Sequence, residues 1–461
     1  MEPVKFVVLY TDVVMWLIVL LLGVALRHAL RSPSLRAKWR RVADNRTAVA
    51  CAAVLLAFLV IALADSVHYR SRIGATPQGE PVYATATSSL LDDLVGRHIA
   101  GRERSYSVPF AIRDFDKTPV IGEKGAVREF QRLKGVAAGL TDEEAVQKRG
   151  RDLALGLGAA LAASGAGLAL AALLAAGLGK PASWLLGRTN RARPALFVLL
   201  VILALSGFLA AVWPGWHVLG TDSTGNDVLM SALKSIRTAV VIGSLATLSA
   251  LPFAMAFGIC AGYFRGWVDD VVQYVYTTIS SIPSVLLIAA SVLMIQVFID
   301  KNPAAFETGL ERADVRLFSL ALIIGVTSWA GLARLLRAET MKVASLDFVT
   351  AAHAFGLSAP SIMLRHVVSN VVHIVLIVAV LDFSGIVLYE AVLSYVGVGV
   401  DPVTESFGTM INAAASEMSR TPAVWWNLAA SFLFMFTLVL SANLFAAGVR
   451  DAFDPRGGRR R

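Results

Sequence analysis

The stretch that decides the fold is DFVTAAHAFGLSAPSIMLRH, residues 347–366, a polar and helix-prone island between two long apolar runs. Its middle carries the alanines Ala351 and Ala352, followed after three further residues by Gly356. Alanines favour a helix with a smooth face that another protein can approach closely. A glycine supplies the positive φ at which one helix ends and the chain turns into the next. The stretch therefore predicts two short helices that project from a membrane and present an apolar surface.

The composition of the whole chain places the flanking runs in a bilayer. Of 461 residues, 56% are hydrophobic and only 16% are charged, and the mean hydropathy is +0.65. Soluble domains carry about a quarter charged residues. The formal net charge of +9 is attributed to cytoplasmic loops and anionic lipid headgroups, and not to nucleic acid. Cys51 and Cys260 lie in separate apolar runs, so we expect them to pack as small hydrophobes.

The expected fold class is an all-α polytopic membrane protein with about nine transmembrane helices. A hydrocarbon core of about 30 Å needs roughly twenty apolar residues per helix. The first run is interpreted as a membrane helix and not as a signal peptide, because it is long, starts with little positive charge and lacks a small-x-small site. The nine runs cover residues 6–26, 47–64, 153–178, 195–212, 238–262, 271–299, 317–336, 371–392 and 424–448.

Basic residues in the short loops predict the orientation. They gather at 27–46, at 187–193 and at the tail 459–461. Placing all three inside, as basic loops require, puts the amino terminus outside, the carboxyl terminus in the cytoplasm, and residues 347–366 in the cytoplasm.

A long polar loop at about 67–151 separates the second and third runs. Thr141 and Glu144 fit a capping box, which predicts a short helix leading into the third run. We expect a small extracytoplasmic domain; a solvated spacer is the alternative. Within the third run, Ala160 and Ser164 place small residues one turn apart, which permits close contact between helices.

Residues 347–366 resemble the cytoplasmic coupling loop, or EAA loop, of importer-type ABC permeases. The family pattern is Glu-Ala-Ala, three residues, Gly and a later hydrophobe. Thr350 stands in place of the Glu, which removes a carboxylate expected to pair with the ATPase, and Ser369 stands in place of a later Pro. The resemblance implies that the loop docks on a separate ATPase subunit. The residues it assigns to this coupling are Asp347, Thr350, Ala351, Ala352, Gly356, Leu357, Ile362 and His366.

Further motifs in register resemble the dipeptide, oligopeptide and nickel permease group. They are GTDSTGND at 220–227, with Asn226 in place of the usual Arg, GYFRGWVDD at 262–270, EAVLSYVGVG at 390–399 and RDAFDPR at 450–456. Residues before 194 fall largely outside the resemblance. We therefore expect an additional membrane region at 1–190, with three helices and the external loop. A permease core at 191–461 would contain six helices and the coupling loop at 347–370.

The resemblance implies a permease subunit of an ATP-driven importer for peptides or a related small solute in the bacterial cytoplasmic membrane. The implied partners are a second permease subunit, two cytoplasmic ATPase subunits, an extracytoplasmic solute-binding protein and membrane lipid, but no nucleic acid. The chain has no G-x-x-x-x-G-K-[ST] motif, since Gly179-Lys180 is followed by Pro181. We expect no catalytic site, metal or cofactor on this chain, with ATP and Mg on the ATPase subunits.

Four residues are candidates for the translocation path. Pro283 is expected to kink the sixth helix because it removes a backbone amide, and Ser284 follows it. Asp382 and Glu390 are carboxylates in the eighth run, where charge is costly and usually faces the bundle interior or water. Asp382 could contact substrate, form an ion pair, or hydrogen-bond in helix packing with Ser384 or a neighbouring subunit; Glu390 is expected to be structural.

The sequence leaves two other functions as alternatives. A stand-alone secondary transporter or channel would need inverted repeats and ion-binding polar residues at the midplane, and of these the sequence offers only Asp382. A membrane-embedded enzyme would need a cluster of His, Asp or Ser at membrane depth. No such cluster stands out.

Overall fold

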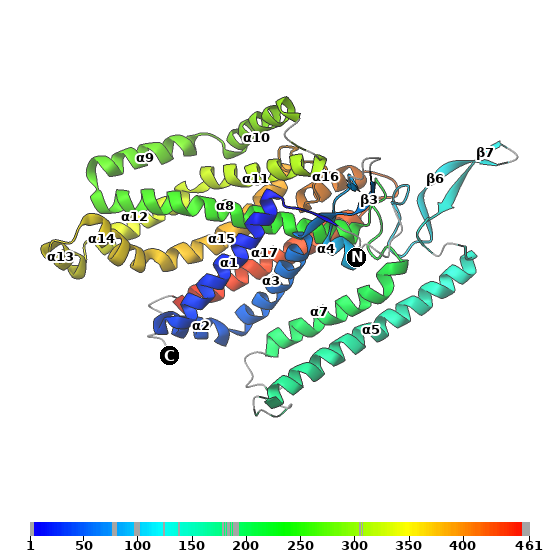
Figure 1. Cartoon of the computed structure of the whole chain (residues 1–461), viewed down its shortest axis with the longest axis horizontal. Coiled ribbons are helices and arrows are strands. Elements are labelled where there is room, and N and C mark those ends of the chain that lie inside the picture. Colours follow the sequence, from blue (N-terminus) through cyan, green and yellow to red (C-terminus); the bar gives the residue numbers. More distant parts are fainter. Residues whose placement is uncertain are drawn as a thin grey trace.

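The computed structural model of the chain describes residues 4–75, 81–95, 102–122, 125–136, 139–177, 179, 181, 185, 187, 193–303, 306 and 308–453. Within these ranges nine helices are long and apolar enough to cross a membrane, as the sequence predicts. The helices run roughly along one direction of the molecule, and strands gather at one end (Figure 1). Some basic positions used for orientation, Arg188, Arg191 and 459–461, lie outside the described residues, as do 454–456 of the last motif.

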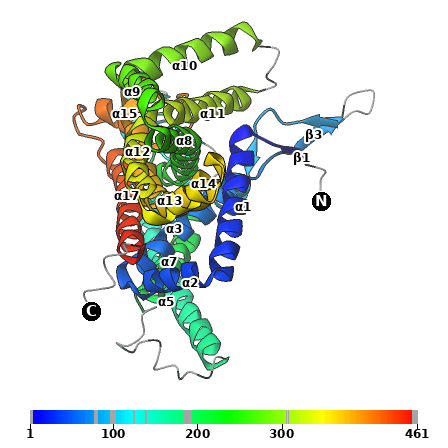
Figure 2. The ribbon, with the colours of Figure 1, turned by 90° about the vertical axis from the view of Figure 1, so that its left-hand side faces the viewer.

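A short helix, α2, joins the first two membrane helices. They are α1 (Tyr10–Arg31) and α3 (Arg46–Asp65), and α2 (Pro33–Asp44) lies across their ends (Figure 2). Pro33 opens α2, where a missing amide costs nothing. Asn45 caps α3 by accepting hydrogen bonds from the amides of Thr47 at 3.1 Å and Ala48 at 3.3 Å.

The loop between α3 and the third membrane helix is folded. Strand β2 (His68–Arg70) lies between β1 (Lys5–Val7) and β5 (Ser88–Ser89) in an antiparallel sheet. Two hairpins, β3 (Arg72–Ala75) with β4 (Pro81–Tyr83) and β6 (Arg113–Gly122) with β7 (Gly125–Arg132), and the short helix α4 (Leu90–Val95) complete it. Because β1 pairs with β2, the chain before α1 lies at the same end of the molecule as this loop.

The third and fourth membrane helices form an antiparallel hairpin of α5 (Asp142–Gly177) and α7 (Arg193–Val212), with a 3-10 turn η2 (Trp213–Gly215) after it. The Thr141 capping box is present, with its amide 2.8 Å from Glu144 Oε2. It begins the long helix α5 itself, not a separate short helix. Ser164 donates to Ala160 O of its own helix. The two helices approach closely at Gly207, where an added Cβ would lie 2.7 Å from Ala159 O.

The remaining helices form a bundle around α8 (Val228–Phe264), which packs against α3, α11, α12 and α15. Fully buried apolar side chains of α8, α11 and α15, such as Ile236, Leu320 and Leu393, make its centre. The other elements are α9 (Gly266–Ser281), α10 (Ser284–Lys301), α11 (Gly309–Ser328), α12 (Ala330–Ala344), α13 (Asp347–Ala354), α14 (Ala359–Ile362), a π-helical turn (Met363–Val367), α15 (Val368–Tyr395), α16 (Phe407–Glu417) and α17 (Trp426–Phe453).

The sixth predicted helix, 271–299, is two helices and not one kinked helix. Helix α9 ends at Ser281 and α10 begins at Ser284. Ile282, before the proline, is extended at φ −85° and ψ 129°, as proline's ring demands of the preceding residue. The chain therefore breaks at Pro283, which caps α10, and only α10 is long and apolar enough to span a membrane.

Packing does not follow the boundary drawn at residue 190. Helix α7, expected to be the first core helix, packs against α5 and α3 (Figure 1). Helix α3 instead lies against α17 and α8. At this contact a Cβ on Gly448 would lie 2.5 Å from Ala48 Cβ, so only glycine allows the observed spacing. A helix of the additional region thus forms part of the bundle.

Candidate functional site

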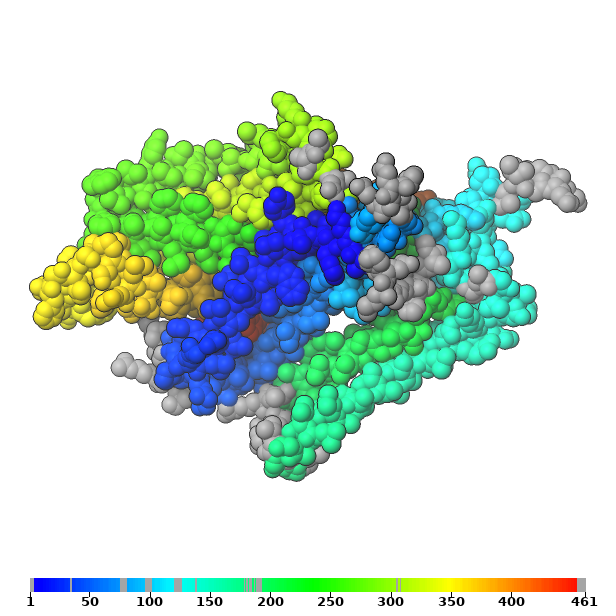
Figure 3. Space-filling model, in the orientation of Figure 1, coloured from blue at the N-terminus to red at the C-terminus, as the bar shows by residue number. Residues whose placement is uncertain are grey.

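The coupling loop, residues 347–366, protrudes beyond the bundle at one end of the molecule, yellow in Figures 1 and 3. Helix α2 and the end of α17 lie toward the same end, and the strands lie at the opposite end (Figure 1). The coupling loop and the described residues beside the basic loops therefore lie toward one end of the molecule. The distribution of arginines predicts this arrangement.

The turn between α13 and α14 is closed by a Schellman motif. Gly356 adopts φ +77°, a conformation that side chains with a Cβ rarely adopt. Its amide donates to His353 O at 2.9 Å, and the amide of Leu357 donates to Ala352 O at 3.2 Å. These two bonds satisfy carbonyls that the helix end would otherwise leave free. The predicted helix–glycine–helix unit is present.

One face of the coupling loop is buried against its own bundle. Val349, Ala352 and Ile362 are 1%, 6% and 0% exposed and pack with Tyr263 and Val343. The hydroxyl of Tyr263 also lies 2.7 Å from Nε2 of His353. Two residues assigned to ATPase coupling, Ala352 and Ile362, thus hold the loop to α8 and α12 and are not offered to a partner.

The other face of the loop is exposed, and most of its side chains are apolar. Phe355 is 87% exposed and Leu364 is 69% exposed, and Ala351, Thr350 and Asp347 are exposed beside them. The remaining members of this face are Phe348, Gly356 and Leu357. His366 is half-buried, with its ring 6.1 Å from that of Phe348. Sequence reasoning missed Phe348, Phe355 and Leu364. The spacing of residues 348, 351 and 355 could have indicated the first two, because it places these three residues on one helix face.

The translocation candidates do not all lie together. The Tyr389 hydroxyl donates to Ser284 Oγ at 2.9 Å, which places the break at Pro283 beside α15. Asp382 is seven residues before Tyr389 and therefore shares its helix face, about 10 Å away. Asp382 makes no hydrogen bond or ion pair within the described ranges. Ser384, one of the partners considered for Asp382, donates instead to Asn443 on α17 at 2.7 Å.

Glu390 lies away from this face. It is 1% exposed, and Ser394 donates a hydrogen bond to its Oε1 at 2.7 Å. This burial favours the structural role expected for Glu390 and not contact with a solute.

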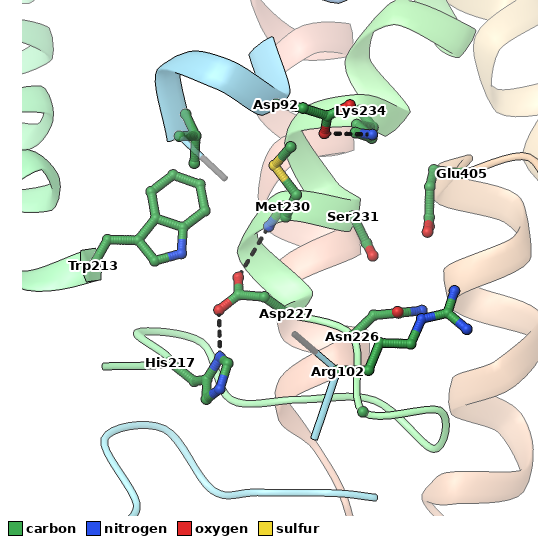
Figure 4. A pocket seen from close by; sticks show the side chains of 12 residues that line it. Asp92, Arg102, Trp213, His217, Asn226, Asp227, Met230, Ser231, Lys234 and Glu405 are labelled. Atoms are coloured by element: carbon green, nitrogen blue, oxygen red, sulfur yellow. Dashed lines mark hydrogen bonds and ion pairs between the residues drawn. The ribbon is translucent and has the colours of Figure 1, made fainter. Parts of the chain in front are cut away.

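At the opposite end a polar hollow of about 280 Å³, the outer pocket, opens where the folded loop meets residues 220–227 (Figure 4). Lys234 pairs with Asp92 at 2.7 Å, and His217 Nδ1 lies 2.8 Å from Asp227 Oδ2. Asp227 also caps α8 by accepting from the Met230 amide at 3.1 Å. Burial is the main influence on the Glu405 carboxyl and raises its pKa.

The GTDSTGND segment is fixed from two sides. The Thr221 amide donates to Ser107 O of the folded loop at 3.1 Å, and Trp426 Nε1 of α17 donates to Thr221 O at 2.9 Å. Gly225 has φ +77°, and an added Cβ would lie 2.1 Å from Glu103 O. The additional region and the core therefore build the outer pocket jointly.

A buried charge cluster also joins the additional region to the core. Arg237 of α8 lies 2.7 Å from Asp12 Oδ1 and 2.6 Å from Thr11 Oγ1 of α1. His68 Nδ1 lies 2.9 Å from Asp12 Oδ2, and Asp314 of α11 accepts from the Tyr10 amide at 2.8 Å. Sequence reasoning missed this cluster; its signal was a charged residue near the start of each of three apolar helices.

Among the described residues no group of three or more His, Cys, Asp or Glu could hold a metal ion. The arrangement of exposed loop, buried charges and outer pocket is that of a membrane component with two opposite polar ends.

Comparison with known proteins places this arrangement in a family. Residues 254–458 match the family described as binding-protein-dependent transport system inner membrane component. The oligopeptide transport system permease protein OppC of Mycobacterium tuberculosis (strain H37Rv) is 31% identical over 239 residues, 52% of this chain and 76% of that protein.

Two further relatives are similar over about the same number of residues. The OppC protein of Haemophilus influenzae is 27% identical over 247 residues, 54% of this chain and 73% of its own length. The glutathione transport system permease protein GsiD of Pectobacterium atrosepticum is 27% identical over 242 residues, 52% and 73% of the two chains. The chain therefore belongs to the binding-protein-dependent transport system inner membrane components, and it is a permease subunit of an ABC importer.

Proposed function

We propose that this permease moves peptides or a related small solute into the cell, powered by two cytoplasmic ATPase subunits that hold the ATP and Mg. A second permease subunit would complete the path, and an extracytoplasmic solute-binding protein would deliver the solute. The single observation that carries the coupling role is the exposed apolar face of the coupling loop. Monomeric proteins rarely present large aromatic and aliphatic side chains at a protruding tip unless a partner covers them.

The proposed mechanism is mechanical. The buried face of the loop ties α13 and α14 to Tyr263 of α8 and Val343 of α12, and the π-helical turn runs directly into α15. A push on Phe355 by a closing ATPase pair would therefore move the loop as a rigid lever. Its displacement would tilt α12 and α15 and change access to the path beside Ser284 and Asp382.

The orientation that the basic loops predict agrees with this proposal. With the coupling loop, α2 and the end of α17 in the cytoplasm, the amino terminus and the strands lie outside. The outer pocket then faces the side from which an importer receives its solute. Its charges are nearly balanced, with Arg102, His217 and Lys234 facing Asp92, Asp227 and Glu405, which suits a zwitterionic solute such as a short peptide.

The test replaces Phe355 with Ser. We expect the purified complex to lose ATPase subunits and peptide uptake into proteoliposomes to fall about tenfold or more, because central aromatic anchors dominate interface energies. Phe6→Ser is the matched control, since Phe6 is 66% exposed on β1 at the opposite end. Gly356→Val tests the turn itself: no neighbouring atom lies within 4 Å, so its effect comes from the strained φ of +77°.

Unchanged co-purification and uptake in both loop variants would overturn the docking role. Equal losses in Phe355→Ser and Phe6→Ser would show a general folding defect and not a lost interface.

A further inference from the structure

A concave basic corner, separate from the coupling loop, lies where α1 meets α2. The hollow has a volume of about 450 Å³ and is lined by the arginines Arg31, Arg36, Arg40 and Arg41, with Asp44 as its single acidic residue. Four guanidinium groups against one carboxylate give the corner a strong positive charge. Its chemistry is that of a site for an anion with several oxygens.

Within the described residues, these four arginines have no partner. All four are exposed, and their side chains make no hydrogen bond or ion pair within the part of the chain that the structure describes. Elsewhere Arg237 and Arg337 are each paired with an aspartate. Arginines that line one hollow without a carboxylate partner can bind the oxygens of a ligand, and phosphate suits the bidentate geometry of guanidinium groups.

Helix α2 packs so that its basic face points away from the helix bundle. Its apolar face, with Val42 5% exposed, packs against the end of α17, where the rings of Trp39 and Phe453 meet edge to face at 5.7 Å. Arg36 and Arg40 are one turn apart on the other face. Because α2 lies across the ends of two membrane helices (Figure 2), it occupies the position of an amphipathic helix at the level of lipid headgroups.

An apolar stripe runs from the basic corner along α1. Leu30, which lines the hollow, is 60% exposed, and Leu26 and Leu22 are 62% and 54% exposed. Their spacing of four residues puts them on one face over about 12 Å. This stripe gives a hydrocarbon chain a surface that begins at the arginines and continues toward the middle of the membrane.

We propose that the corner binds the phosphate headgroup of an anionic phospholipid, with one acyl chain along Leu30, Leu26 and Leu22. A free phosphate ion would use the same arginines but would gain nothing from the stripe. Charge and apolar surface together therefore select a lipid. The bound lipid fixes the α1–α2 corner in the leaflet on the side of the coupling loop.

The experiment measures lipid retention by the purified full chain in detergent, using native mass spectrometry. Phosphatidylglycerol and phosphatidylcholine with the same acyl chains are the two probes. We expect the native chain to retain phosphatidylglycerol preferentially, and Arg36→Gln/Arg40→Gln to weaken that retention about tenfold, since each basic residue contributes to attraction for anionic lipid. Retention of phosphatidylcholine should not change.

The control Arg27→Gln/Arg450→Gln removes the same charge from exposed positions toward the same end that do not line the hollow, and it should retain the native preference. Arg36→Lys/Arg40→Lys keeps the charge but loses the planar forks, so it should fall between the native chain and the Gln variant.

Three outcomes would overturn the proposal. The first is equal retention of the two lipids by the native chain. The second is equal loss in the Gln variant and its control. The third is displacement of phosphatidylglycerol by inorganic phosphate at equal concentration, which would assign the corner to a free anion. If the Gln variant does not fold, the Lys variant provides the test: weaker retention of phosphatidylglycerol than in the native chain supports the site, and unchanged retention overturns it.

Discussion

At the residue scale, His217 is the most distinctive group of the outer pocket. It is 2% exposed and lies between Asp227 and Glu103, at 2.8 Å and 3.6 Å. Burial by itself would lower the pKa of His217. The hydrogen bond to Asp227, together with the negative charges of Asp227 and Glu103, outweighs burial and raises that pKa from 6.5 to about 9. His217 is therefore an imidazolium at neutral pH and links the folded loop to the start of α8.

This pKa predicts how stability depends on pH. A pKa raised by folding contributes stability that is complete below the unfolded value of 6.5 and is lost as pH rises through about 9. The loss should be on the order of 3 kcal/mol at most. Thermal unfolding of the native protein should show a Tm that falls across that pH interval. The His217→Gln variant should have a lower Tm at the start of the interval, and its Tm should fall less as the pH rises.

His28→Gln is the control for this prediction, because His28 is exposed near the end of α1. It should follow the native pH profile. A native Tm that stays flat or rises between pH 6.5 and 9 would contradict the charged state assigned to His217.

At the scale of elements, the hairpin of α5 and α7 depends on a glycine where α7 lies close to the backbone of α5. An added Cβ at Gly207 would lie 2.7 Å from Ala159 O and 2.8 Å from Ala163 Cβ. Gly207→Leu should separate the helices and cost about 1–3 kcal/mol through overpacking. The measurement is a lower Tm with faster proteolysis of α5.

Gly165→Leu is the matched change on the same hairpin, since no atom lies within 4 Å of a Cβ at Gly165. It should leave Tm and proteolysis almost unchanged. If both leucine variants behave alike, the hairpin contact seen at Gly207 does not hold the two helices together.

At the scale of the whole molecule, the buried charge cluster decides whether the additional region and the core are one unit. Asp12 and Arg237 are 3% and 7% exposed. Removing one partner leaves a buried charge uncompensated, which costs about 3–5 kcal/mol. We expect Asp12→Leu and Arg237→Met each to destabilise the protein strongly, and the double variant to cost clearly less than the sum.

Chemical unfolding in detergent of the two single variants and the double variant measures this coupling. Asp116→Ala is the control, because Asp116 and Arg420 form an ion pair at 2.8 Å that is well exposed, and such pairs contribute at most about 1 kcal/mol. Additive losses at Asp12 and Arg237 would mean that α1 is only loosely attached to the core.

The amino-acid sequence by itself determined the local features of this protein. Nine apolar runs of membrane length, the capping box at Thr141 and the turn at Gly356 all depend on residues close together along the chain. Hydrogen bonds within a helix and the φ of a glycine are satisfied locally, so composition and spacing were sufficient. The motif register also determined the importer family, because those motifs are short and contiguous.

Only the tertiary structure decided how these features meet. It placed Ala352 and Ile362 on the buried face of the coupling loop and Phe355 on the exposed face. It paired α7 with α5, put α3 into the bundle, and joined Arg237 to Asp12 across 225 positions of sequence. Such contacts depend on which helices share a surface, and nearly uniform apolar runs do not encode their neighbours. Burial, unlike helix formation, is a property of the assembled molecule.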